Sequence, residues 1–149
     1  MLIADYLRKN LVLADLAATA KPDVLKELVE PLQNEFPDLN LASALQVLLE
    51  REQLGTTGIG DGVAIPHGKL VGLDRIILVV GRSRRGVRFE ALDGKPCTIF
   101  FLVLAPEQAA GMHLRILAHI SKLLKDQEFR RSFLEADGRD ELHALLKTM

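Results

Sequence analysis

Tryptophan is absent from this chain of 149 residues, and phenylalanine and tyrosine together make up only 5% of it. Apolar residues nevertheless account for 48% of the sequence, so the core must be mainly aliphatic. The length is that of one domain with a sizeable core. We therefore expect a single domain spanning residues 1–149.

Cysteine is nearly absent as well, because Cys97 stands alone. A single thiol forms no internal disulfide, which is consistent with a reducing compartment. No apolar run approaches the ~20 residues that a membrane-spanning helix needs, and residues 1–6 lack the basic region of a signal peptide. The sequence therefore predicts a cytoplasmic protein without membrane insertion.

An excess of charge of either sign is also missing. The chain has 19 lysines and arginines against 20 aspartates and glutamates, a formal net charge of −1. Nucleic acids and anionic membranes attract strongly basic proteins, so this balance argues against both as the main partner. Function must depend on a local arrangement of residues.

The hydrophobic pattern alternates between helical and strand periods along the chain. Helices are expected over residues 2–10, 22–32, 41–53, 113–124, 126–135 and 139–147. Strands are expected over residues 11–16, 76–80, 87–91 and 97–105, with residues 82–86 forming an exposed, charged turn. Strands with helices before and after them predict a mixed α/β sheet that is covered on both faces.

The helix expected over residues 41–53 carries signals at both ends. Asn40 is a good N-cap, and Gly55 is placed to end the helix. Arg51 lies in the last turn, where a positive charge compensates the helix dipole and where lysine would serve equally well. Arginine also offers a planar fork that matches phosphoryl oxygens, and this side chain can reach over the glycine-rich loop that follows. Both roles of Arg51 stay open at this point.

Residues 55–70 read Gly-Thr-Thr-Gly-Ile-Gly-Asp-Gly-Val-Ala-Ile-Pro-His-Gly-Lys-Leu and contain five glycines. Glycine lets main-chain N–H groups approach a ligand closely. Pro66 restricts its own backbone and that of Ile65, so His67 is presented stiffly. A donor-rich loop beside a rigid imidazole suits a site that handles an anion. The alternative is a glycine-rich connection with an incidental surface histidine.

Two common phosphate-binding motifs do not fit this stretch. A P-loop requires G-x-x-x-x-G-K-[ST], but Gly62 and Gly68 are one residue too far apart, and Leu70 replaces the hydroxyl residue. The dinucleotide fingerprint G-x-G-x-x-G follows a strand, whereas this stretch has other spacing and follows a helical pattern. Neither nucleotide-binding fold is predicted.

A longer ordered motif is present. Arg51-Glu52, then Gly55-Thr56-Thr57-Gly58-Ile59-Gly60, then Gly62-Val63-Ala64-Ile65-Pro66-His67 closely resembles the EIIA domains of the fructose/mannitol type in the bacterial phosphotransferase system. His67-Gly68-Lys69-Leu70 is most similar to the nitrogen-regulatory EIIA proteins. The resemblance covers nearly the whole chain and is weakest before Lys21.

The resemblance implies a three-layer α/β/α sandwich with a mixed sheet. It also implies that a phospho-HPr-type protein phosphorylates His67 on Nε2, and that an EIIB domain or a regulated target protein is the next partner. The family's counterpart of His113 lies beside the phosphorylated histidine, so His113 and Arg51 are expected to stabilise the phosphoryl group. No metal or cofactor is required. The expected phosphate-binding loop consists of Thr56, Thr57, Gly58, Gly60 and Gly62.

The residues themselves support this chemistry. Neutral imidazole is a nucleophile near pH 7, because its ordinary pKa of about 6.5 leaves it mostly unprotonated. Phosphoryl transfer demands mainly positioning and charge stabilisation, which N–H groups, hydroxyls and Arg51 supply. His113 has the alternative role of a capping or partly buried histidine.

The other candidate residues carry weaker signals. His119 and His143 are expected to be structural or surface groups, and Cys97 a structural thiol. A zinc site built from His67, His113, His119 and Cys97 would lack the paired ligand spacing of known zinc motifs.

Three functions compete on this sequence. The first is a phosphocarrier whose donor docks on an apolar rim of Ile59, Val63 and residues around Met112, with Arg51 buried at the centre. The second is a regulatory module whose protein contacts depend on the charge at His67. The third is a domain that binds a small anion in the glycine loop without becoming modified. The nitrogen-regulatory resemblance favours a regulatory phosphocarrier over a sugar-transport EIIA that donates to a fructose- or mannitol-type EIIB.

Overall fold

The structure, a computed structural model, describes residues 3–149. Two short 3₁₀ turns, Ile3–Asp5 and Lys9–Leu11, open this part of the chain. The strands are β1 (Val12–Leu13), β2 (Gly58–Gly60), β3 (Val63–Ala64), β4 (His67–Leu70), β5 (Ile77–Val87) and β6 (Cys97–Pro106). The helices are α1 (Lys21–Val29), α2 (Leu32–Glu35), α3 (Leu41–Gln53), α4 (Ala110–Leu124), α5 (Gln127–Glu135) and α6 (Gly138–Lys147).

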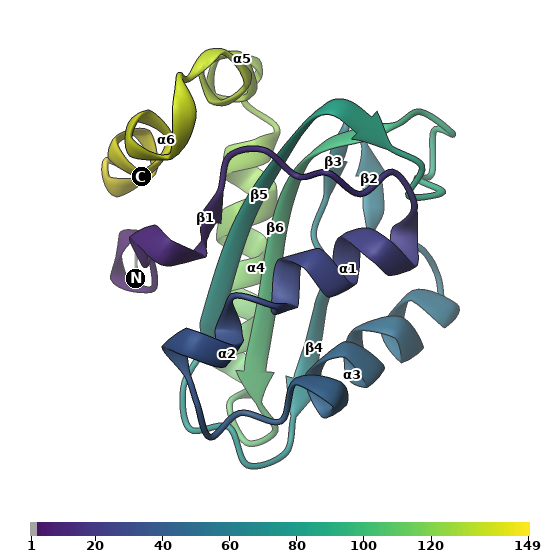
Figure 1. Ribbon diagram of the computed structural model, residues 1–149, viewed down its shortest axis with the longest axis vertical. Helices are drawn as coiled ribbons and strands as arrows, with labels where there is room; N and C mark the ends of the chain where they lie inside the picture. The colour runs from purple at the N-terminus through teal and green to yellow at the C-terminus, as the bar shows by residue number, and fades with distance from the viewer. Residues whose placement is uncertain (1–2) are drawn as a thin grey trace.

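The six strands form one mixed sheet in the order β1-β5-β6-β3-β2, with β4 paired to β6 beyond the end of β3. β5 and β6 are antiparallel, whereas β1 runs parallel to β5, and both β3 and β4 run parallel to β6. Helices α1, α2 and α3 cover one face, and α4, α5 and α6 cover the other (Figure 1). The expected three-layer α/β/α sandwich is confirmed.

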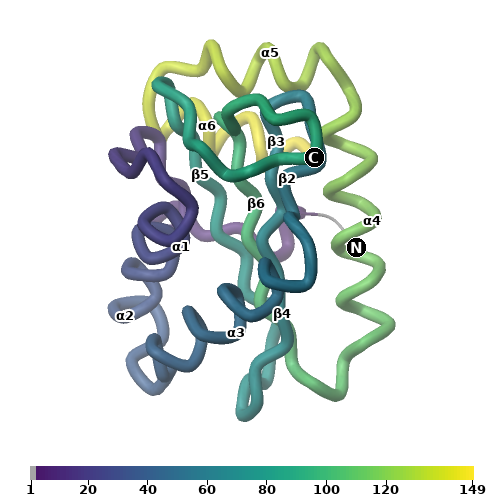
Figure 2. The backbone as a smooth tube through the Cα atoms, turned by 90° about the vertical axis from the view of Figure 1, so that its right-hand side faces the viewer, coloured from purple at the N-terminus to yellow at the C-terminus, as the bar shows by residue number. Residues whose placement is uncertain are grey.

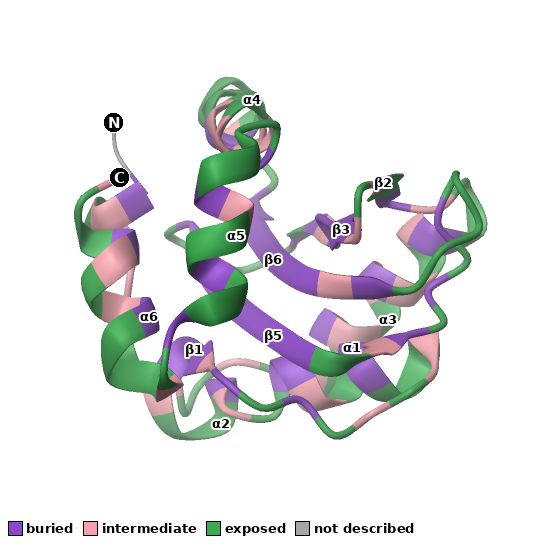
Figure 3. Ribbon diagram, turned by 90° about the horizontal axis from the view of Figure 1, so that it is seen from above, coloured by how far each residue is buried: buried purple, intermediate pink, exposed green. Residues whose placement is uncertain are grey.

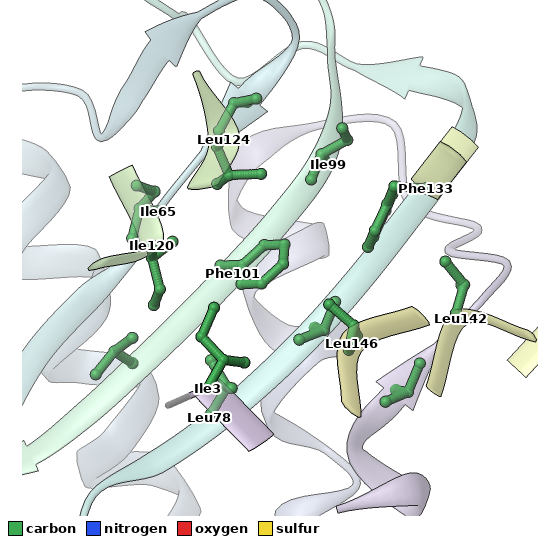
Figure 4. Close-up of a cluster of buried hydrophobic side chains, with 14 of the residues drawn as sticks. Ile3, Ile65, Leu78, Ile99, Phe101, Ile120, Leu124, Phe133, Leu142 and Leu146 are labelled. Carbon is green, nitrogen blue, oxygen red and sulfur yellow. The ribbon is translucent and has the colours of Figure 1, made fainter. Parts of the chain in front are cut away.

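Two hydrophobic cores lie on the two faces of the sheet. Along β6, Ile99, Phe101 and Val103 point into the core beneath α4, α5 and α6. Phe100 and Leu102 point into the core beneath α1, α2 and α3. Both faces of the strand are buried, which explains why its sequence is apolar except at Thr98. Figure 3 shows β6 and most of β5 buried, and Figure 4 shows Phe101 amid aliphatic side chains.

Several expected elements are confirmed in detail. The Asn40 side chain accepts a hydrogen bond from the N–H of Ser43 and caps α3. Asp126 caps α5 by accepting from the N–H groups of Glu128 and Phe129. Strong local signals, such as caps and a long apolar strand, therefore identified these elements correctly.

The amino-terminal elements differ from the prediction. Leu2 lies outside the described residues, and the rest of the expected helix over 2–10 is divided into two 3₁₀ turns. The chain here serves both cores, since Ile3 is buried in one and Leu11 in the other, and a single amphipathic helix presents only one apolar face. The strand expected over 11–16 is reduced to β1, and Pro31 separates α1 from α2 because proline lacks an N–H.

The expected exposed turn at residues 82–86 is wrong. β5 continues through Val87, and Arg82 and Ser83 are fully buried, although Arg84 and Arg85 are exposed. The guanidinium of Arg82 donates to the carbonyl oxygens of Ala14, Phe133 and Ala136. These acceptors replace the water that a charged group would otherwise require. Residues 87–91 also differ from the expected strand, because only Val87 belongs to β5.

The glycine-rich segment is a hairpin rather than a loop. β2 pairs antiparallel with β3, and the turn between them places Asp61 and Gly62 at positive φ, 56° and 76°. Gly58 is required by close packing, because a Cβ there would lie 2.8 Å from the Cβ of Ala91. The glycines of this hairpin therefore serve backbone geometry.

No helix within residues 3–149 is both long and apolar enough to cross a membrane.

Candidate active site

His67 is the first residue of β4 and pairs with Val103 of β6. Figure 2 shows β4 between α3 on one side and α4 on the other. Gly68 allows α3 to pack directly on the strand, because a Cβ at this position would collide with the side chain of Val47. The carbonyl of Pro66 accepts a hydrogen bond from the N–H of Val103, 2.9 Å away, which extends the pairing to the residue before the histidine. The backbone of His67 is therefore held by the sheet.

One ring nitrogen of His67 is already engaged. Nδ1 lies 2.8 Å from the carbonyl oxygen of Ile65. A carbonyl only accepts hydrogen bonds, so this contact puts the proton on Nδ1 and leaves the lone pair of Nε2 free. Burial of the half-exposed ring lowers the pKa of His67 below its ordinary value, although the hydrogen bond to Ile65 opposes the shift. At neutral pH the side chain is a neutral imidazole with its nucleophilic nitrogen at Nε2.

His113 comes to the same place from α4. The helix begins at Ala110, earlier than expected, so His113 lies in its first turn. The His67 and His113 rings are 5.6 Å apart between centroids and meet edge to face. Nε2 of His113 is buried and has no hydrogen-bond partner among the described residues. Burial, reinforced by the charges of His67 and Lys69, lowers the pKa of His113 to about 4, so this ring is also neutral at pH 7.

Arg51 reaches the site from the last turn of α3. Its Nη1 donates to the carbonyl oxygen of Gly55, 2.9 Å away, and the side chain is half-exposed. Its positive charge is one of the causes that lower the pKa of His67. The structure therefore brings together Arg51, His67 and His113, three residues from three separate elements.

These residues line a groove of about 670 Å³ between α3, β4 and α4. Two leucines on its walls, Leu54 and Leu114, are 85% and 68% exposed, and the sequence analysis did not identify them. Met112 is 46% exposed in the same turn of α4 as His113. An exposed pair of large apolar residues beside a polar centre is typical of a protein-docking surface.

The expected apolar rim needs two corrections. Val63 is 1% exposed, because it belongs to β3 and its side chain is part of the core beneath α4. Ile59 is exposed, as expected. Arg51 is not buried at the centre of the rim but half-exposed at the end of α3.

The five residues expected to form a phosphate-binding loop lie in and beside the β2–β3 hairpin and do not line the groove. The hydroxyl of Thr57 donates to the carboxylate of Glu52, and that of Thr56 accepts from the N–H of Gly58. The other two, Gly60 and Gly62, adopt positive φ. Their hydrogen-bonding groups are used within the scaffold around the site.

Sequence reasoning missed the pair formed by Lys21 and Glu52. Lys21 Nζ lies 3.0 Å from Glu52 Oε1, and the two side chains are 14% and 4% exposed. A signal was available, because Lys21 is the first residue of α1 and Glu52 is in the last turn of α3. Both charges oppose the usual preference of the helix dipole, which indicates that another interaction holds them there.

The remaining candidates lie elsewhere. Neither His119, on α4, nor His143, on α6, lines the groove. Cys97 is fully buried in the core beneath α1, α2 and α3, where burial raises the pKa of its thiol to about 11. No group of three or more histidine, cysteine, aspartate or glutamate side chains in residues 3–149 is arranged to hold a metal ion.

This geometry suits transfer of a phosphoryl group. It offers a nucleophilic nitrogen with a fixed tautomer, a guanidinium for anionic oxygens, and an unpaired imidazole nitrogen within the same groove. Phosphoryl transfer depends chiefly on such positioning and charge stabilisation.

Comparisons with known proteins identify relatives of this chain. The nitrogen regulatory protein of Bradyrhizobium diazoefficiens is 38% identical over 146 residues, which cover 98% of this chain and 95% of that protein. The fructose-specific EIIABC component of Bacillus subtilis is 34% identical over 142 residues, or 95% of this chain and 22% of that protein. The crystal structure of nitrogen regulatory protein IIA-Ntr from Neisseria meningitidis superposes with a TM-score of 0.89 at 33% identity, covering 97% and 98% of the two chains.

A sequence profile of the family described as "Phosphoenolpyruvate-dependent sugar phosphotransferase system, EIIA 2" matches residues 5–149. The match includes the whole groove and both helices that form its walls. This protein therefore belongs to the EIIA 2 family of the phosphoenolpyruvate-dependent sugar phosphotransferase system.

Proposed function

We propose that His67 accepts a phosphoryl group on Nε2 from a phospho-HPr-type protein, and that the chain passes the group on or uses its charge as a regulatory signal. The observation that carries the proposal is the 2.8 Å contact between Nδ1 of His67 and the carbonyl oxygen of Ile65. This contact selects the tautomer in which Nε2 is the nucleophile. The catalytic unit is the whole domain, residues 1–149.

The transfer step follows from the tautomer. The lone pair of Nε2 attacks phosphorus, and the bond from phosphorus to the donor's histidine nitrogen breaks. The electron pair of that bond returns to the donor ring, whose other nitrogen carries a proton, so that the donor leaves as a neutral imidazole. The proton on Nδ1 stays in its hydrogen bond to Ile65, so no proton needs to leave His67. Onward transfer is the reverse displacement, with Nε2 of His67 as the leaving nitrogen.

Arg51 and His113 stabilise the transferred group. The guanidinium of Arg51 offers several N–H donors to anionic phosphoryl oxygens, beyond the one bound to Gly55. Nε2 of His113 is buried and has no partner in the described part of the chain, and it donates to a phosphoryl oxygen when it carries the proton. The added negative charge raises the pKa of His113, which strengthens this bond only after phosphorylation.

The hairpin residues Thr56, Thr57, Gly58, Gly60 and Gly62 have a supporting role in this proposal. Their contacts are to the scaffold, so they shape the site without touching the phosphoryl group. The donor docks on the exposed apolar surface of Leu54, Met112 and Leu114.

The regulatory role rests on the relatives whose names state it. Two of the compared proteins are nitrogen regulatory proteins, and both match this chain over nearly its full length. A phosphoryl group adds about −1.5 to −2 charges in the phosphoserine case, and a similar change beside Leu54 and Leu114 alters which proteins dock there. The Bacillus subtilis relative favours the second candidate, a sugar-transport EIIA that donates to an EIIB domain.

Phosphorylation is tested by incubating the protein with phospho-HPr and following its intact mass. His67→Ala should abolish the mass increase, whereas His119→Ala, a change on α4 outside the groove, should leave it intact. The label should be acid-labile and alkali-stable, as phosphohistidine is. Unchanged labelling of His67→Ala, or a label on His113, would refute the assignment.

The choice between regulation and transport is tested by onward transfer. The phosphorylated protein is mixed with fructose- and mannitol-type EIIB domains, and loss of label is followed over time. Slow transfer without sugar phosphorylation supports the regulatory role. Rapid transfer coupled to sugar phosphorylation would establish the transport role and leave the phosphocarrier chemistry intact.

A further inference from the structure

The Glu52 carboxylate lies next to Arg51 in the sequence but points away from the groove into the protein. The Glu52 side chain is 4% exposed, and its carboxylate binds three groups from two other segments. Oε1 accepts from the backbone N–H of Thr57 at 3.0 Å and from Lys21 Nζ at 3.0 Å, and Oε2 accepts from the Thr57 hydroxyl. One carboxylate therefore ties the last turn of α3 to Thr57, the residue that leads into β2.

The turn closed by this carboxylate orients Arg51. The N–H of Leu54 donates to the Arg51 carbonyl at 3.2 Å, and the N–H of Gly55 donates to the Glu52 carbonyl at 3.1 Å. The Gly55 carbonyl, in turn, accepts from Arg51 Nη1. Anchoring Thr57 to Glu52 fixes where the Gly55 carbonyl points, and hence where the guanidinium lies.

A second branch reaches His67. The carbonyl of Thr57 accepts from the N–H of Ile65 at 3.1 Å, and the carbonyl of Ile65 receives Nδ1–H of His67 at 2.8 Å. Three consecutive hydrogen bonds thus connect Glu52 to the imidazole through Thr57 and Ile65.

We propose that Glu52 is a positioning residue that sets both the Arg51 guanidinium and the His67 tautomer through its hold on Thr57. This inference rests on the proposed function, because it concerns the same site. It assigns a role to a carboxylate that neither touches the phosphoryl group nor lines the groove.

The hydrogen bonds from Glu52 to His67 fix the position of the backbone and do not form a path for proton transfer. The N–H and C=O of Thr57 belong to different peptide groups, and the same holds for Ile65. The links are therefore joined through backbone dihedrals. Rotation of Thr57 displaces the Ile65 carbonyl, and the His67 tautomer is then no longer selected by a well-aligned acceptor.

Lys21 completes the arrangement by balancing the charge. Its Nζ lies 3.0 Å from Glu52, 3.4 Å from the Thr56 hydroxyl oxygen and 4.6 Å from the centre of the Phe89 ring. Without Lys21, the Glu52 carboxylate would set a negative charge near the place where a phosphoryl dianion must arrive. With it, the positive charge of Arg51 remains available for the transferred group.

The first test uses ¹⁵N NMR of the histidine rings in the unphosphorylated protein at neutral pH. Wild type should show His67 with its proton on Nδ1. Glu52→Ala should give a mixture of tautomers, whereas Glu52→Gln keeps an acceptor for the Thr57 N–H and should retain the Nδ1–H form. Glu52→Asp, which keeps the charge and shortens the reach, should give an intermediate result and replaces the alanine variant if that does not fold.

The matched control is Glu35→Ala. Glu35 also holds two side chains, Arg8 and Asn10, but it lies at the end of α2. The Glu35→Ala variant should lower the free energy of unfolding without changing the ¹⁵N signals of the His67 ring. The inference is overturned if folded Glu52→Ala, or Glu52→Asp in its place, keeps the wild-type tautomer, or if Glu35→Ala shifts it equally.

Phosphorylation by phospho-HPr provides the second readout. Glu52→Ala should slow transfer roughly tenfold to a hundredfold, the scale expected when a reacting group is misplaced by about 1 Å. Glu52→Gln should stay close to wild type, and a loss as large as that of Glu52→Ala would overturn positioning in favour of charge. The tautomer is measured without any donor, so it tests Glu52 even if the proposed phosphorylation of His67 fails.

Discussion

Arg82 and His113 are two buried side chains whose nitrogen atoms differ in their hydrogen bonding. Arg82 is fully buried on β5 and donates to backbone carbonyls at 3.0 Å to Ala14, 3.0 Å to Phe133 and 2.6 Å to Ala136, with a longer contact of 3.5 Å to Leu134. Its Nη2 has no partner within residues 3–149. His113 is nearly as buried, yet its Nε2 has no hydrogen-bond partner among the described residues.

The difference agrees with a structural role for Arg82 and with the chemical role that we propose for His113. The carbonyls around Arg82 belong to the segment after β1 and to the end of α5, so the guanidinium joins distant parts of the chain. Buried polar groups are normally hydrogen-bonded, so an unpaired one requires an explanation. His113 lines the groove with His67, and in our proposal the phosphoryl group supplies the partner for its Nε2.

The largest effect is expected from replacing Arg82, which tests whether its role is structural. Arg82→Met keeps much of the apolar stem but removes the buried donor to the carbonyls of Ala14, Phe133 and Ala136, so we expect a loss of about 3 kcal/mol or more in the free energy of unfolding. Phosphorylation of the folded fraction should persist. Urea denaturation gives the stability, with Arg84→Met as the control. Arg84 is largely exposed, its pair with Asp15 is 3.5 Å apart, and its Nη2 reaches the carbonyl oxygen of Ala136 only at 3.4 Å, so its removal should cost less than about 1 kcal/mol. Similar losses for the two variants would contradict a structural role for Arg82.

Arg51→Lys tests whether the guanidinium of Arg51 stabilises the transferred phosphoryl group. Lysine keeps the positive charge at the end of α3 but loses the planar fork, so we expect phosphoryl transfer to slow by roughly a hundredfold if the fork holds phosphoryl oxygens. Stability should change by less than about 1 kcal/mol. Transfer rates from phospho-HPr and melting temperatures, measured side by side, decide the matter. Equal transfer rates would leave Arg51 with helix-dipole compensation alone.

Acid should destabilise the protein through His113. Burial holds its pKa at about 4 in the folded state, against an ordinary value of 6.5, so the unfolded chain binds the proton more readily between these values. The contribution of neutral, buried His113 to the free energy of unfolding is therefore fully present above pH 6.5. It is lost progressively as the pH falls from 6.5 toward 4. The loss reaches about 2 kcal/mol near pH 5. Urea unfolding as a function of pH should show this slope, and His113→Gln should flatten it. An unchanged slope in the variant would place the acid sensitivity elsewhere.

The smallest expected effect is that of His113→Ala on transfer. His67 keeps its tautomer and Arg51 its position, so the variant should still be phosphorylated at His67, about tenfold more slowly. Rapid-quench measurement with phospho-HPr gives the rate. Wild-type speed would show that the unpaired Nε2 of His113 takes no part in the transfer.

Much of this protein follows from local sequence signals. Asn40 and Asp126 cap their helices as predicted, because a cap depends on residues only two or three positions away. β6 was recognisable, since a strand covered on both faces must be apolar throughout. The presentation of His67 after Pro66 was predictable for the same local reason. The roles of His67, Arg51 and His113 in transfer remain predictions.

Other features depend on contacts between distant segments. Arg82 was predicted to be exposed because arginine usually is, and the carbonyls that accept from it lie 51 to 68 residues away in the chain. Val63 was expected on the surface and lies in the core because β3 pairs with β6. The acceptor on Nδ1 of His67, the groove and the exposed faces of Leu54 and Leu114 are likewise products of packing.

The sequence by itself determined which groups are present and which short segments have strong structural preferences. It specified a mixed α/β domain, a stiffly presented histidine and an arginine at the end of a helix. Only the tertiary structure decided which nitrogen of His67 is free, which buried groups are paired, and that Glu52 and Lys21 meet beneath the site. The physical reason is that local preference acts over a few residues, whereas burial and hydrogen-bond satisfaction depend on what the folded chain brings alongside.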